Sequence, residues 1–365
     1  MPNKHYYCAI LAGGLGTRFW PISRKALPKQ FLGFSPDGKT FLRQAYERLL
    51  GVIPEQNILV VSLTRYRDAV LESIPELPEQ NLLLEPYGRN TAPCLAYATY
   101  SLLQRDPQAV MLICPSDHLI TNVGLFRHTV SEALDYAAVN DALITLGIVP
   151  DRADTNFGYI QAVGGKGAYE HTRPVRVKTF TEKPDAELAQ VFVKTGEFLW
   201  NSGIFAWKAS IIKEEMERFV PQVTNLFKGW EEHIGKASEA EFLERAYTDM
   251  ERISIDYAVM EKTDRDWLFA ANFGWADIGN WESLYKYIAH PDEAGNVTNA
   301  SHTLMQGSRR NIVVTHNPDK LVALGSLEGF VVVDSEDVLM ICPRNDKKLK
   351  EITTHIGLPD FEDFR

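Results

Sequence analysis

A glycine-rich loop near the start of the chain is followed by basic residues, and this combination is suited to holding phosphate groups. The glycines Gly13, Gly14 and Gly16 directly follow an apolar run, and Arg18 and Lys29 come soon afterwards. Glycine lets the backbone turn tightly, which leaves N–H groups exposed along the loop. Basic side chains beside such a loop neutralise the charge of a bound anion. The pattern predicts a polyphosphate-binding loop at the end of a strand.

Two familiar phosphate-binding motifs do not fit this loop. The dinucleotide fingerprint needs a third glycine where the chain has Phe19, and a large ring there would prevent close helix–strand packing. The loop is also not followed by the Gly-Lys-Ser/Thr of a Walker motif. The glycines alone would fit an ordinary strand-to-helix turn. The longer string, with Trp20-Pro21, Ser23-Arg24 and Pro28-Lys29-Gln30, favours phosphate binding.

Two aspartates stand where an α/β sheet usually gathers its ligands. Asp117 follows the apolar run 110–114 by three residues. Asp277 lies in the short segment 275–279, which ends in a glycine, and stands between two tryptophans. Either residue alone could be a turn residue or a helix cap. Their surroundings, Pro-Ser-Asp-His in one case and the glycine-bounded turn in the other, favour a role in binding or catalysis.

The elements that would position these residues alternate through the first half of the chain. Short apolar runs at 58–62, 110–114 and 142–148 are typical of buried strands, and 91–103 has helical composition. This alternation predicts a mostly parallel sheet with helices on both faces, and ligands then bind at the carboxyl ends of the strands.

The C-terminal part has a different character. From about residue 290, short β-rich segments recur at roughly ten-residue spacing with Gly, Asn and Asp between them. We therefore predict two domains, residues 1–289 and 290–365. The spacing alone does not separate a β-helix from a meander.

Composition excludes several classes of protein. The 365 residues carry a formal charge of −10, which argues against a nucleic-acid-binding surface. We see no apolar run of membrane-spanning length and no signal-peptide core, so we expect a cytoplasmic protein. The cysteines have no metal-binding spacing and are expected to be small buried residues: Cys8, Cys94, Cys114 and Cys342.

The string GG-x-GTR-x-WP-x-SR…PKQF resembles the signature of the sugar nucleotidyltransferases, and in this wording that of the mannose-1-phosphate guanylyltransferases. The resemblance continues in family order through six further segments: Glu85–Pro93, Pro115–His118, Phe180–Pro184, Trp200–Phe205, Ser254–Lys262 and Trp275–Trp281. It implies a Rossmann-like, mostly parallel α/β nucleotidyltransferase domain with a small all-β unit resembling a left-handed β-helix. It also implies a homodimer.

The resemblance implies transfer of GMP from GTP to mannose 1-phosphate. A sugar-phosphate oxygen attacks the α-phosphorus and pyrophosphate leaves, so no protein nucleophile is needed. The metal would be Mg²⁺ or Mn²⁺ on Asp117 and Asp277, a ligand choice that suits a cation preferring oxygen. We expect His118 to be a neighbour rather than a ligand.

The implied site residues fall into three groups. The catalytic group is Arg18, Lys29, Asp117, Lys183 and Asp277. The nucleotide-binding group is Leu11, Ala12, Gly13, Gly14, Gly16, Thr17, Arg18, Lys29, Glu85, Asn90, Thr91, Ala92, Ser116 and Asp117. The sugar-binding group is Gly158, Tyr159, Glu182, Lys183, Asn201, Ser202 and Gly203. Arg24 is a weaker candidate, because a structural ion pair would also explain it.

The base contact rests on chemistry more than on pattern. Glu85 follows the apolar run 82–84, and a carboxylate can accept hydrogen bonds from both N1–H and the amino group of guanine. The alternative is that Glu85 is a solvated residue and that backbone carbonyls read the base.

Three competing functions remain to be weighed. One is the same chemistry with another hexose 1-phosphate or nucleotide, and another is a non-catalytic regulatory paralogue that keeps the fold. The presence of the whole catalytic group argues against loss of catalysis. A nicotinamide-dependent oxidoreductase is disfavoured by Phe19.

Overall fold

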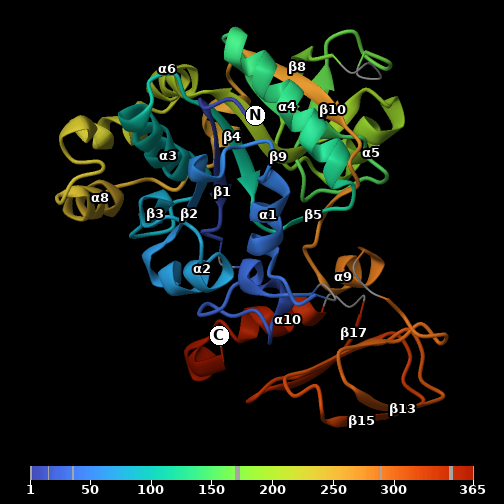
Figure 1. Ribbon diagram of the computed structural model, residues 1–365. Coiled ribbons are helices and arrows are strands. Elements are labelled where there is room, and N and C mark those ends of the chain that lie inside the picture. The colour runs from blue at the N-terminus through green and yellow to red at the C-terminus, as the bar shows by residue number, and fades with distance from the viewer. Residues whose placement is uncertain are drawn as a thin grey trace. The chain divides into compact units, whose positions relative to one another are not determined.

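The computed structural model describes residues 2–14, 16–34, 37–168, 173–287, 290–344 and 348–364. These residues form two compact units (Figure 1). The first, which we call the sheet unit, comprises Met1–Gly13, Leu42–Ser116 and Ile120–Trp275. The second, the coil unit, comprises Gly14–Phe41, Asp117–Leu119 and Ala276–Arg365. Most of the predicted phosphate loop therefore belongs to the same unit as the C-terminal region.

The sheet unit is built on one large sheet. Within the described residues the sheet has nine strands in the order β3-β2-β1-β4-β9-β6-β10-β8-β7. The strands are β1 (Tyr6–Leu11), β2 (Ile58–Leu63), β3 (Leu82–Glu85), β4 (Val110–Pro115), β6 (Leu143–Ile148), β7 (Tyr159–Ala162), β8 (Val175–Thr181), β9 (Phe198–Lys208) and β10 (Asp266–Ala271).

The sheet is mixed, which corrects the prediction of a mostly parallel one. Strands β3, β2, β1 and β4 are parallel neighbours, as the alternation in the first half indicates. Strand β9 lies antiparallel between β4 and β6, and β8 lies antiparallel to β7 and β10. A parallel pair needs a long crossover, whereas an antiparallel pair does not. Strands β7 and β8 form an antiparallel pair. Strand β9, which follows them in the sequence, runs antiparallel to its neighbours β4 and β6.

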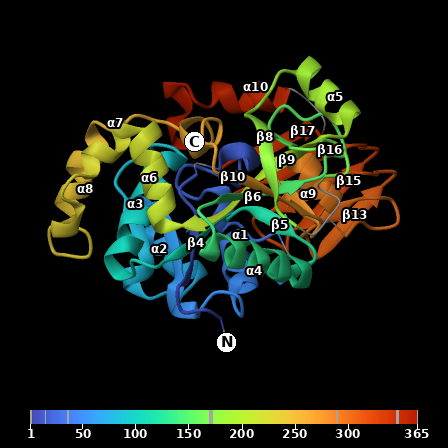
Figure 2. The ribbon, with the colours of Figure 1, turned by 90° about the horizontal axis from the view of Figure 1, so that it is seen from above.

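Helices flank this sheet on two sides, with α4 on one side and α6 on the other (Figures 1 and 2). Helix α3 starts at Asn90, whose side chain accepts a hydrogen bond from the Thr91 amide, and α5 ends at Gly196 in the left-handed conformation. The helices of this unit are α1 (Phe41–Leu49, which starts at the unit boundary), α2 (Arg67–Ser73), α3 (Thr91–Arg105), α4 (Val123–Val139), α5 (Ala186–Thr195), α6 (Ala209–Phe219), α7 (Pro221–Thr224) and α8 (Glu239–Thr248).

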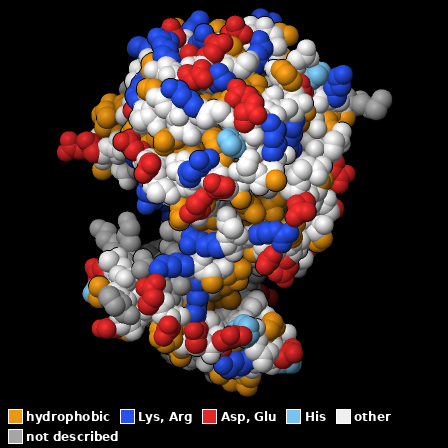
Figure 3. Space-filling view, turned by 90° about the vertical axis from the view of Figure 1, so that its left-hand side faces the viewer, with side chains coloured by type: hydrophobic (Ala, Val, Ile, Leu, Met, Phe, Trp, Pro, Cys, Tyr) orange, Lys and Arg blue, Asp and Glu red, His pale blue; other side chains and the backbone are white. Residues whose placement is uncertain are grey.

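Further expectations from composition can be compared with the described residues. All four cysteines are buried, as predicted. Among the described helices, none combines the length and the apolar character that crossing a membrane would require. On the face shown in Figure 3, acidic and basic side chains are interspersed. Binding of an anion to this chain therefore depends on local groups of cations rather than on its net charge.

The coil unit contains strands that return in parallel. Strands β12, β14 and β16 pair in parallel, and β13 pairs in parallel with β15. Among the described pairings of β12 to β17, only the last, β16 with β17, is antiparallel. An antiparallel meander would not give this pattern. The elements are α9 (Trp281–Tyr287), β12 (Val297–Thr298), β13 (His302–Gln306), β14 (Ile312–Thr315), β15 (Leu321–Gly325), β16 (Phe330–Asp334), β17 (Leu339–Pro343) and α10 (Lys348–His355). Two short strands, β5 (His118–Ile120) and β11 (Trp275–Asp277), pair with each other.

The core of the coil unit joins distant parts of the sequence. Residues of the segment 19–41 pack with residues of α9 and of the parallel strands. The buried members are Phe19, Trp20, Leu32, Phe41, Ala276, Ile278, Trp281, Leu284, Ile312, Val331, Val333, Met340 and Cys342. The predicted domain boundary after residue 289 stays a prediction, but this core draws on residues from both sides of it.

Candidate active site

The glycine loop folds back onto the segment that carries Lys29. Gly16 has φ of +50°, and a Cβ built on it would lie 2.5 Å from the Lys29 backbone nitrogen, so a larger residue has no room there. The Gln30 side-chain amide donates to the Gly14 carbonyl over 2.9 Å. Lys29 opens a short 3₁₀ helix, Lys29–Phe31. The loop is therefore packed directly against the segment that carries the lysine.

The Lys29 ammonium lies between the two predicted metal-binding carboxylates. Its Nζ is 3.0 Å from Asp117 Oδ2 and 3.2 Å from Asp277 Oδ1, and the lysine side chain is only 3% exposed. Arg18 Nη1 lies 3.6 Å from Asp277 Oδ2, with its side chain 59% exposed. All four residues belong to the coil unit. The structure thus brings Arg18, Lys29, Asp117 and Asp277 together, as the resemblance implied.

Neighbouring positive charge holds Asp117 in its ionised form. Burial alone would raise the pKa of Asp117, but the Lys29 ammonium, with His118 and Arg18, holds it well below its usual range. His118 Nε2 lies 3.9 Å from Asp117 Oδ1. Asp117 therefore remains a carboxylate across the physiological pH range.

These carboxylates fit a divalent cation. Both already approach one positive centre within 3.2 Å, and both present oxygen, which Mg²⁺ prefers. Mg²⁺ is usually held by one or two protein carboxylates together with waters and substrate phosphates. Among the described residues no group of three or more His, Cys, Asp or Glu forms a closed metal cage. A two-carboxylate site that is completed by substrate agrees with that observation.

A second group of predicted residues lies in the sheet unit, just after β8. Glu182 and Lys183 form an ion pair through Oε1 and Nζ, and Lys183 adopts a left-handed φ of +46°. The Glu182 side chain is 5% exposed, whereas that of Lys183 is 55% exposed. The backbone N–H of Asn201 donates to the Gly158 carbonyl over 2.8 Å, which connects β9 to the residue before β7. An uncommon backbone conformation at a charged residue is typical of functional sites.

Other predicted sugar-binding side chains point into the protein. The Ser202 hydroxyl donates to the Leu146 carbonyl over 2.6 Å and is buried. The Tyr159 ring is also buried, and its hydroxyl bonds to the backbone of Asp154. Gly203 has φ of +69° and its amide donates to Asn201 Oδ1. These side chains shape the turn and leave Glu182, Lys183 and Asn201 as the polar groups of this site.

Glu85 is buried, which rules out the alternative that it is a solvated residue. It is 3% exposed, and the Tyr247 hydroxyl donates to its Oε1 over 3.0 Å. Burial raises the pKa of Glu85 to about 7, against hydrogen bonds from Tyr247 and Cys94 that lower it. A Cβ built on Gly13 would lie 3.4 Å from Glu85 Oε2, so this oxygen faces the glycine loop. Sequence reasoning missed Tyr247 and Cys94 as its partners.

The remaining predicted nucleotide-binding residues of the sheet unit lie at or just after the ends of β1 and β4 and at the start of α3. The Ser116 amide donates to Leu11, and the Ala12 carbonyl accepts from the Ser62 hydroxyl. Asn90 has φ of +71° and caps α3. Thr91 and Ala92 bond to Ile255 and Ile253, respectively, through a side-chain oxygen and a backbone amide. Thr17 opens a short 3₁₀ helix in the coil unit, Thr17–Phe19.

Arg24 and Lys25 have structural partners within the coil unit. Arg24 forms a forked ion pair with Asp337, with Nη1 2.8 Å from Oδ2, and Lys25 Nζ lies 2.6 Å from Glu362 Oε1. The Trp20 indole donates to the Phe364 carbonyl over 2.8 Å. The structural ion pair weighed for Arg24 is therefore present.

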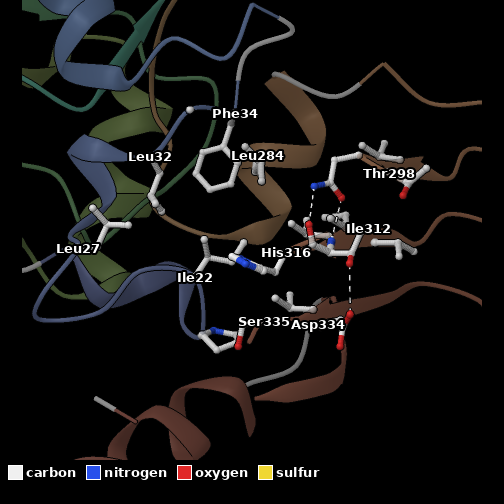
Figure 4. Close-up of a pocket in the computed structure, with 18 of the residues that line it drawn as sticks. Ile22, Leu27, Leu32, Phe34, Leu284, Thr298, Ile312, His316, Asp334 and Ser335 are labelled. Carbon is white, nitrogen blue, oxygen red and sulfur yellow. Dashed lines mark hydrogen bonds between the residues drawn. The ribbon is translucent and has the colours of Figure 1, made fainter. Parts of the chain in front are cut away.

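A cavity of about 880 Å³ lies within the coil unit, beside the segment that carries Arg24. Ile22, Leu27, Leu32 and Phe34 line it on the loop side, facing residues of the parallel strands such as Ile312 (Figure 4). Leu32 and Ile312 also belong to the buried core of this unit. The segment is therefore attached by apolar packing as well as by the polar contacts at Trp20, Arg24 and Lys25.

Sequence reasoning also overlooked one motif. Residues 33–40, GFSPDGKT, match the spelling of a Walker loop. A true P-loop follows a strand and wraps around phosphate, whereas this segment follows the 3₁₀ helix 29–31. A Cβ on Gly33 would lie 2.3 Å from the Gly38 carbonyl oxygen, so these glycines pack against each other. Residues 35 and 36 lie outside the described residues.

Comparison with known proteins agrees with this geometry. The profile of the nucleotidyl transferase family matches residues 8–293, which is most of the chain. The chain belongs to the nucleotidyl transferase family.

Individual relatives narrow the assignment. A putative mannose-1-phosphate guanylyltransferase of Vibrio cholerae is 33% identical over 98% of this chain and 75% of its own length. The mannose-1-phosphate guanylyltransferase of Escherichia coli K12 is 34% identical over 94% of this chain and 72% of its own length. A solved structure from Thermus thermophilus, described as a mannose-1-phosphate geranyltransferase, superposes with a TM-score of 0.83 at 28% identity, covering 97% of this chain and 100% of that one. These relatives place the chain among the mannose-1-phosphate guanylyltransferases.

Proposed function

We propose that the protein transfers GMP from GTP to mannose 1-phosphate, forming GDP-mannose and pyrophosphate. The observation that carries the proposal is Lys29, a buried ammonium between Asp117 and Asp277 directly behind a glycine loop. In this group the ammonium is suited to binding phosphate and the two carboxylates to binding a divalent cation. The attacking group in this reaction is the sugar phosphate, so no protein nucleophile is needed.

The reaction is a displacement at the α-phosphorus of GTP. A phosphate oxygen of mannose 1-phosphate forms a bond to that phosphorus, and the bond to the β-bridging oxygen breaks with release of pyrophosphate. The attacking phosphate is already ionised, so the protein positions the reactants and offsets their charge. Lys29 would contact the α-phosphate and Arg18 the β- and γ-phosphates. Lys183 would hold the sugar phosphate.

Asp117 and Asp277 would hold the divalent ion, Mg²⁺ or Mn²⁺. When bound, the ion reduces the mutual repulsion of the two phosphate groups as a Lewis acid. Asp117 remains ionised because the Lys29 charge lowers its pKa. Lys29, which lies between the two carboxylates, would contact the α-phosphate.

We propose Glu85 as the group that reads guanine, through the oxygen that faces the glycine loop. Its other oxygen is committed to Tyr247. A carboxyl with a pKa of about 7 is partly protonated in the neutral range, and its ionised form is the stronger acceptor for the guanine donors. The contact is therefore expected to strengthen as pH rises through 7.

Four further expectations remain proposals. The parallel coil would be a left-handed β-helix, and the protein would form a homodimer. Its location would be the cytoplasm. A functional division would fall near residue 290, close to where the family profile ends.

The test is pyrophosphate release measured across four nucleoside triphosphates and several hexose 1-phosphates, with and without Mg²⁺. We expect the highest kcat/KM with GTP and mannose 1-phosphate and no turnover with excess chelator. Preference for another pair would assign the same chemistry to other substrates. Absence of release with every pair would favour a regulatory paralogue, and full activity in chelator would remove the metal from the proposal.

A further inference from the structure

Gly279 lies two residues after Asp277, in the motif WADIGNW, and the proposed reaction gives it no role. It has no positive φ, so a left-handed backbone does not require a glycine here. Its N–H donates to the Asp277 carbonyl over 2.9 Å, which a residue with a side chain could also do. Neither the backbone conformation nor this hydrogen bond therefore explains why a glycine stands at this position.

The guanidinium of Arg18 occupies the space where a side chain at position 279 would begin. A Cβ built on Gly279 would lie 2.8 Å from Arg18 Nη1, which is closer than such atoms approach each other in proteins. The same Cβ would lie 3.4 Å from Asp277 Oδ2, an ordinary van der Waals distance. An alanine at this position would therefore conflict with the arginine but not with the aspartate.

Such a conflict would displace Arg18 and leave the fold intact. The atom that the Cβ approaches is the end of a flexible side chain, and that side chain is 59% exposed. Its Nη1 lies 3.6 Å from Asp277 Oδ2, which is an ion pair but is longer than a hydrogen bond. Because an exposed ion pair contributes little to stability, the guanidinium can turn away at small cost.

Aromatic packing fixes the backbone on both sides of this contact. Phe19 follows Arg18 directly and Trp281 follows Gly279 by two residues; both rings are buried, with centroids 5.2 Å apart in an edge-to-face arrangement. The Phe19 backbone N–H also donates to the Ser23 hydroxyl over 2.9 Å. Since the two backbone segments are held together, the room available to the guanidinium depends on the size of the side chain at position 279.

We propose that Gly279 is a positioning residue for Arg18, because its missing side chain leaves the place in which the guanidinium lies beside Asp277 and contacts the β- and γ-phosphates of GTP. The proposal rests on the proposed function, in which Arg18 makes this contact. Gly279 acts through the arginine and does not touch the substrate. An arginine binds phosphate through a planar fork of donors, so a small displacement of the guanidinium loses part of the contact.

The first experiment compares Gly279→Ala with wild-type protein in both directions of the reaction. GTP and pyrophosphate carry the phosphates that Arg18 contacts, whereas mannose 1-phosphate and GDP-mannose lack them. We expect KM for GTP and for pyrophosphate to rise about ten-fold or more, because one charge-assisted contact is weakened. KM for mannose 1-phosphate and for GDP-mannose should stay within about two-fold, and the melting temperature within about 2 °C of wild type.

A double-mutant cycle with Arg18→Ala tests whether Gly279 acts through the arginine. The readout is calorimetric binding of pyrophosphate in the presence of Mg²⁺, which needs no turnover. Gly279→Ala should weaken binding about ten-fold in the wild-type background and less than about two-fold in the Arg18→Ala background. The loss should also shrink in the Arg18→Lys background, because an ammonium is more compact than a guanidinium.

Gly325→Ala serves as the matched control. Gly325 also belongs to the coil unit, where it is the last residue of β15. It has no positive φ, and a Cβ built on it would meet nothing within 4 Å. The control should therefore match the wild-type protein in every measurement.

Four outcomes separate the alternatives. Unchanged KM for GTP and pyrophosphate in Gly279→Ala, or an equal loss of binding in the Arg18→Ala background, would overturn the proposal. An equal loss in Gly325→Ala would assign the effect to general loosening of the coil unit and also overturn it. If wild-type protein turns over no substrate pair, the proposed function fails, and the binding cycle still decides the role of Gly279. With neither turnover nor binding of pyrophosphate, both are overturned.

Discussion

At the residue scale, the candidate site depends on how buried charges are balanced. Lys29 is the counter-ion of two carboxylates, and Glu85 is a buried acid with neutral donors around it. The Lys29 ammonium is stabilised by the two carboxylates beside it, whereas burial raises the pKa of Glu85. Substitutions here should therefore alter metal binding and pH dependence more than overall folding.

Asp277→Asn should reduce kcat by at least about a hundred-fold, because a ligand of the divalent ion becomes neutral. We also expect Mg²⁺ with GTP to raise the melting temperature of the wild-type protein and to raise that of the variant much less. Pyrophosphate release and thermal unfolding with and without Mg²⁺ provide the measurements. Asp319→Asn, at an exposed acid of the coil unit, should behave as wild type. Undiminished turnover in Asp277→Asn would remove this metal ligand.

Glu85→Gln should flatten the dependence of stability on pH. The pKa of Glu85 rises from 4.5 to about 7 on folding, so the folded state binds more protons than the unfolded state between these values. The free energy of unfolding of the wild-type protein therefore falls as pH rises through this window. Between pH 5 and 8 the free energy of unfolding should fall by about 1–3 kcal/mol less in the variant than in the wild-type protein.

Denaturant unfolding at several pH values measures this effect, and Glu72→Gln, at an exposed acid of α2, is the control. The same Glu85 variant should narrow the preference for GTP over ATP if the side chain reads guanine. A normal pH dependence with an unchanged nucleotide ratio would contradict both expectations. A changed pH dependence with an unchanged ratio would leave the reading of the base to the backbone.

At the element scale, the segment between the glycine loop and α1 is fastened to the C-terminal region. The segment carries Arg18 and Lys29 on its way to α1, and its apolar side chains share the core of the parallel coil. Behind it lies the cavity, and at its edge lie the ion pairs of Arg24 and Lys25. The coil is thus part of what positions the phosphate-binding cations.

Arg24→Met and Asp337→Asn should each lower kcat/KM about three- to thirty-fold with little change in melting temperature. A partly exposed ion pair contributes only about 0–1 kcal/mol to stability, but a small shift of Lys29 or Arg18 weakens catalysis much more. The exchange of both charges, Arg24→Asp with Asp337→Arg, should restore part of the activity.

The matched control for this pair is Arg309→Met. Arg309 forms an exposed ion pair with Glu328, 3.0 Å apart in the same unit, away from the segment 14–41. If the control loses as much activity as Arg24→Met, general loosening of the coil explains the loss. If neither the Arg24 nor the Asp337 variant loses activity, the ion pair between these residues has no role in positioning Lys29 and Arg18.

At the scale of the whole molecule, the two compact units do not coincide with the N- and C-terminal parts of the sequence. The coil unit takes in residues 14–41 as well as the C-terminal strands. Its core therefore cannot form from residues 290–365 alone, nor can the segment 14–41 bury its aromatic side chains without the coil.

A fragment of residues 1–289 should be insoluble or inactive. It would expose Phe19, Trp20, Leu32 and Phe41, which now pack against the coil, and each buried aromatic or aliphatic side chain stabilises by about 1.5–3 kcal/mol. Expression yield, size-exclusion chromatography and pyrophosphate release would test this. A fragment ending at residue 344 keeps β12–β17 and should stay soluble. A soluble and active 1–289 fragment would show that the coil is dispensable.

The sequence by itself determined the class of chemistry and the elements of the first half. Each of the motifs, including the glycine loop with Lys29 and the short strings at strand ends, is a local stretch of sequence. Such motifs can be interpreted without knowledge of the fold. The helix from Thr91 was predicted because its cap and apolar positions are local features. The apolar runs at 58–62, 110–114 and 142–148 likewise became buried strands.

Only the tertiary structure decided which of these residues meet. Lys29 and Asp277 are 248 positions apart, and Glu85 and Tyr247 are 162 apart. The direction of β9 in the sheet and the parallel returns of the coil were likewise undetermined by spacing. The physical reason is the same throughout. Propensity and capping act over a few residues, whereas a counter-ion or a strand partner is fixed by packing between distant segments.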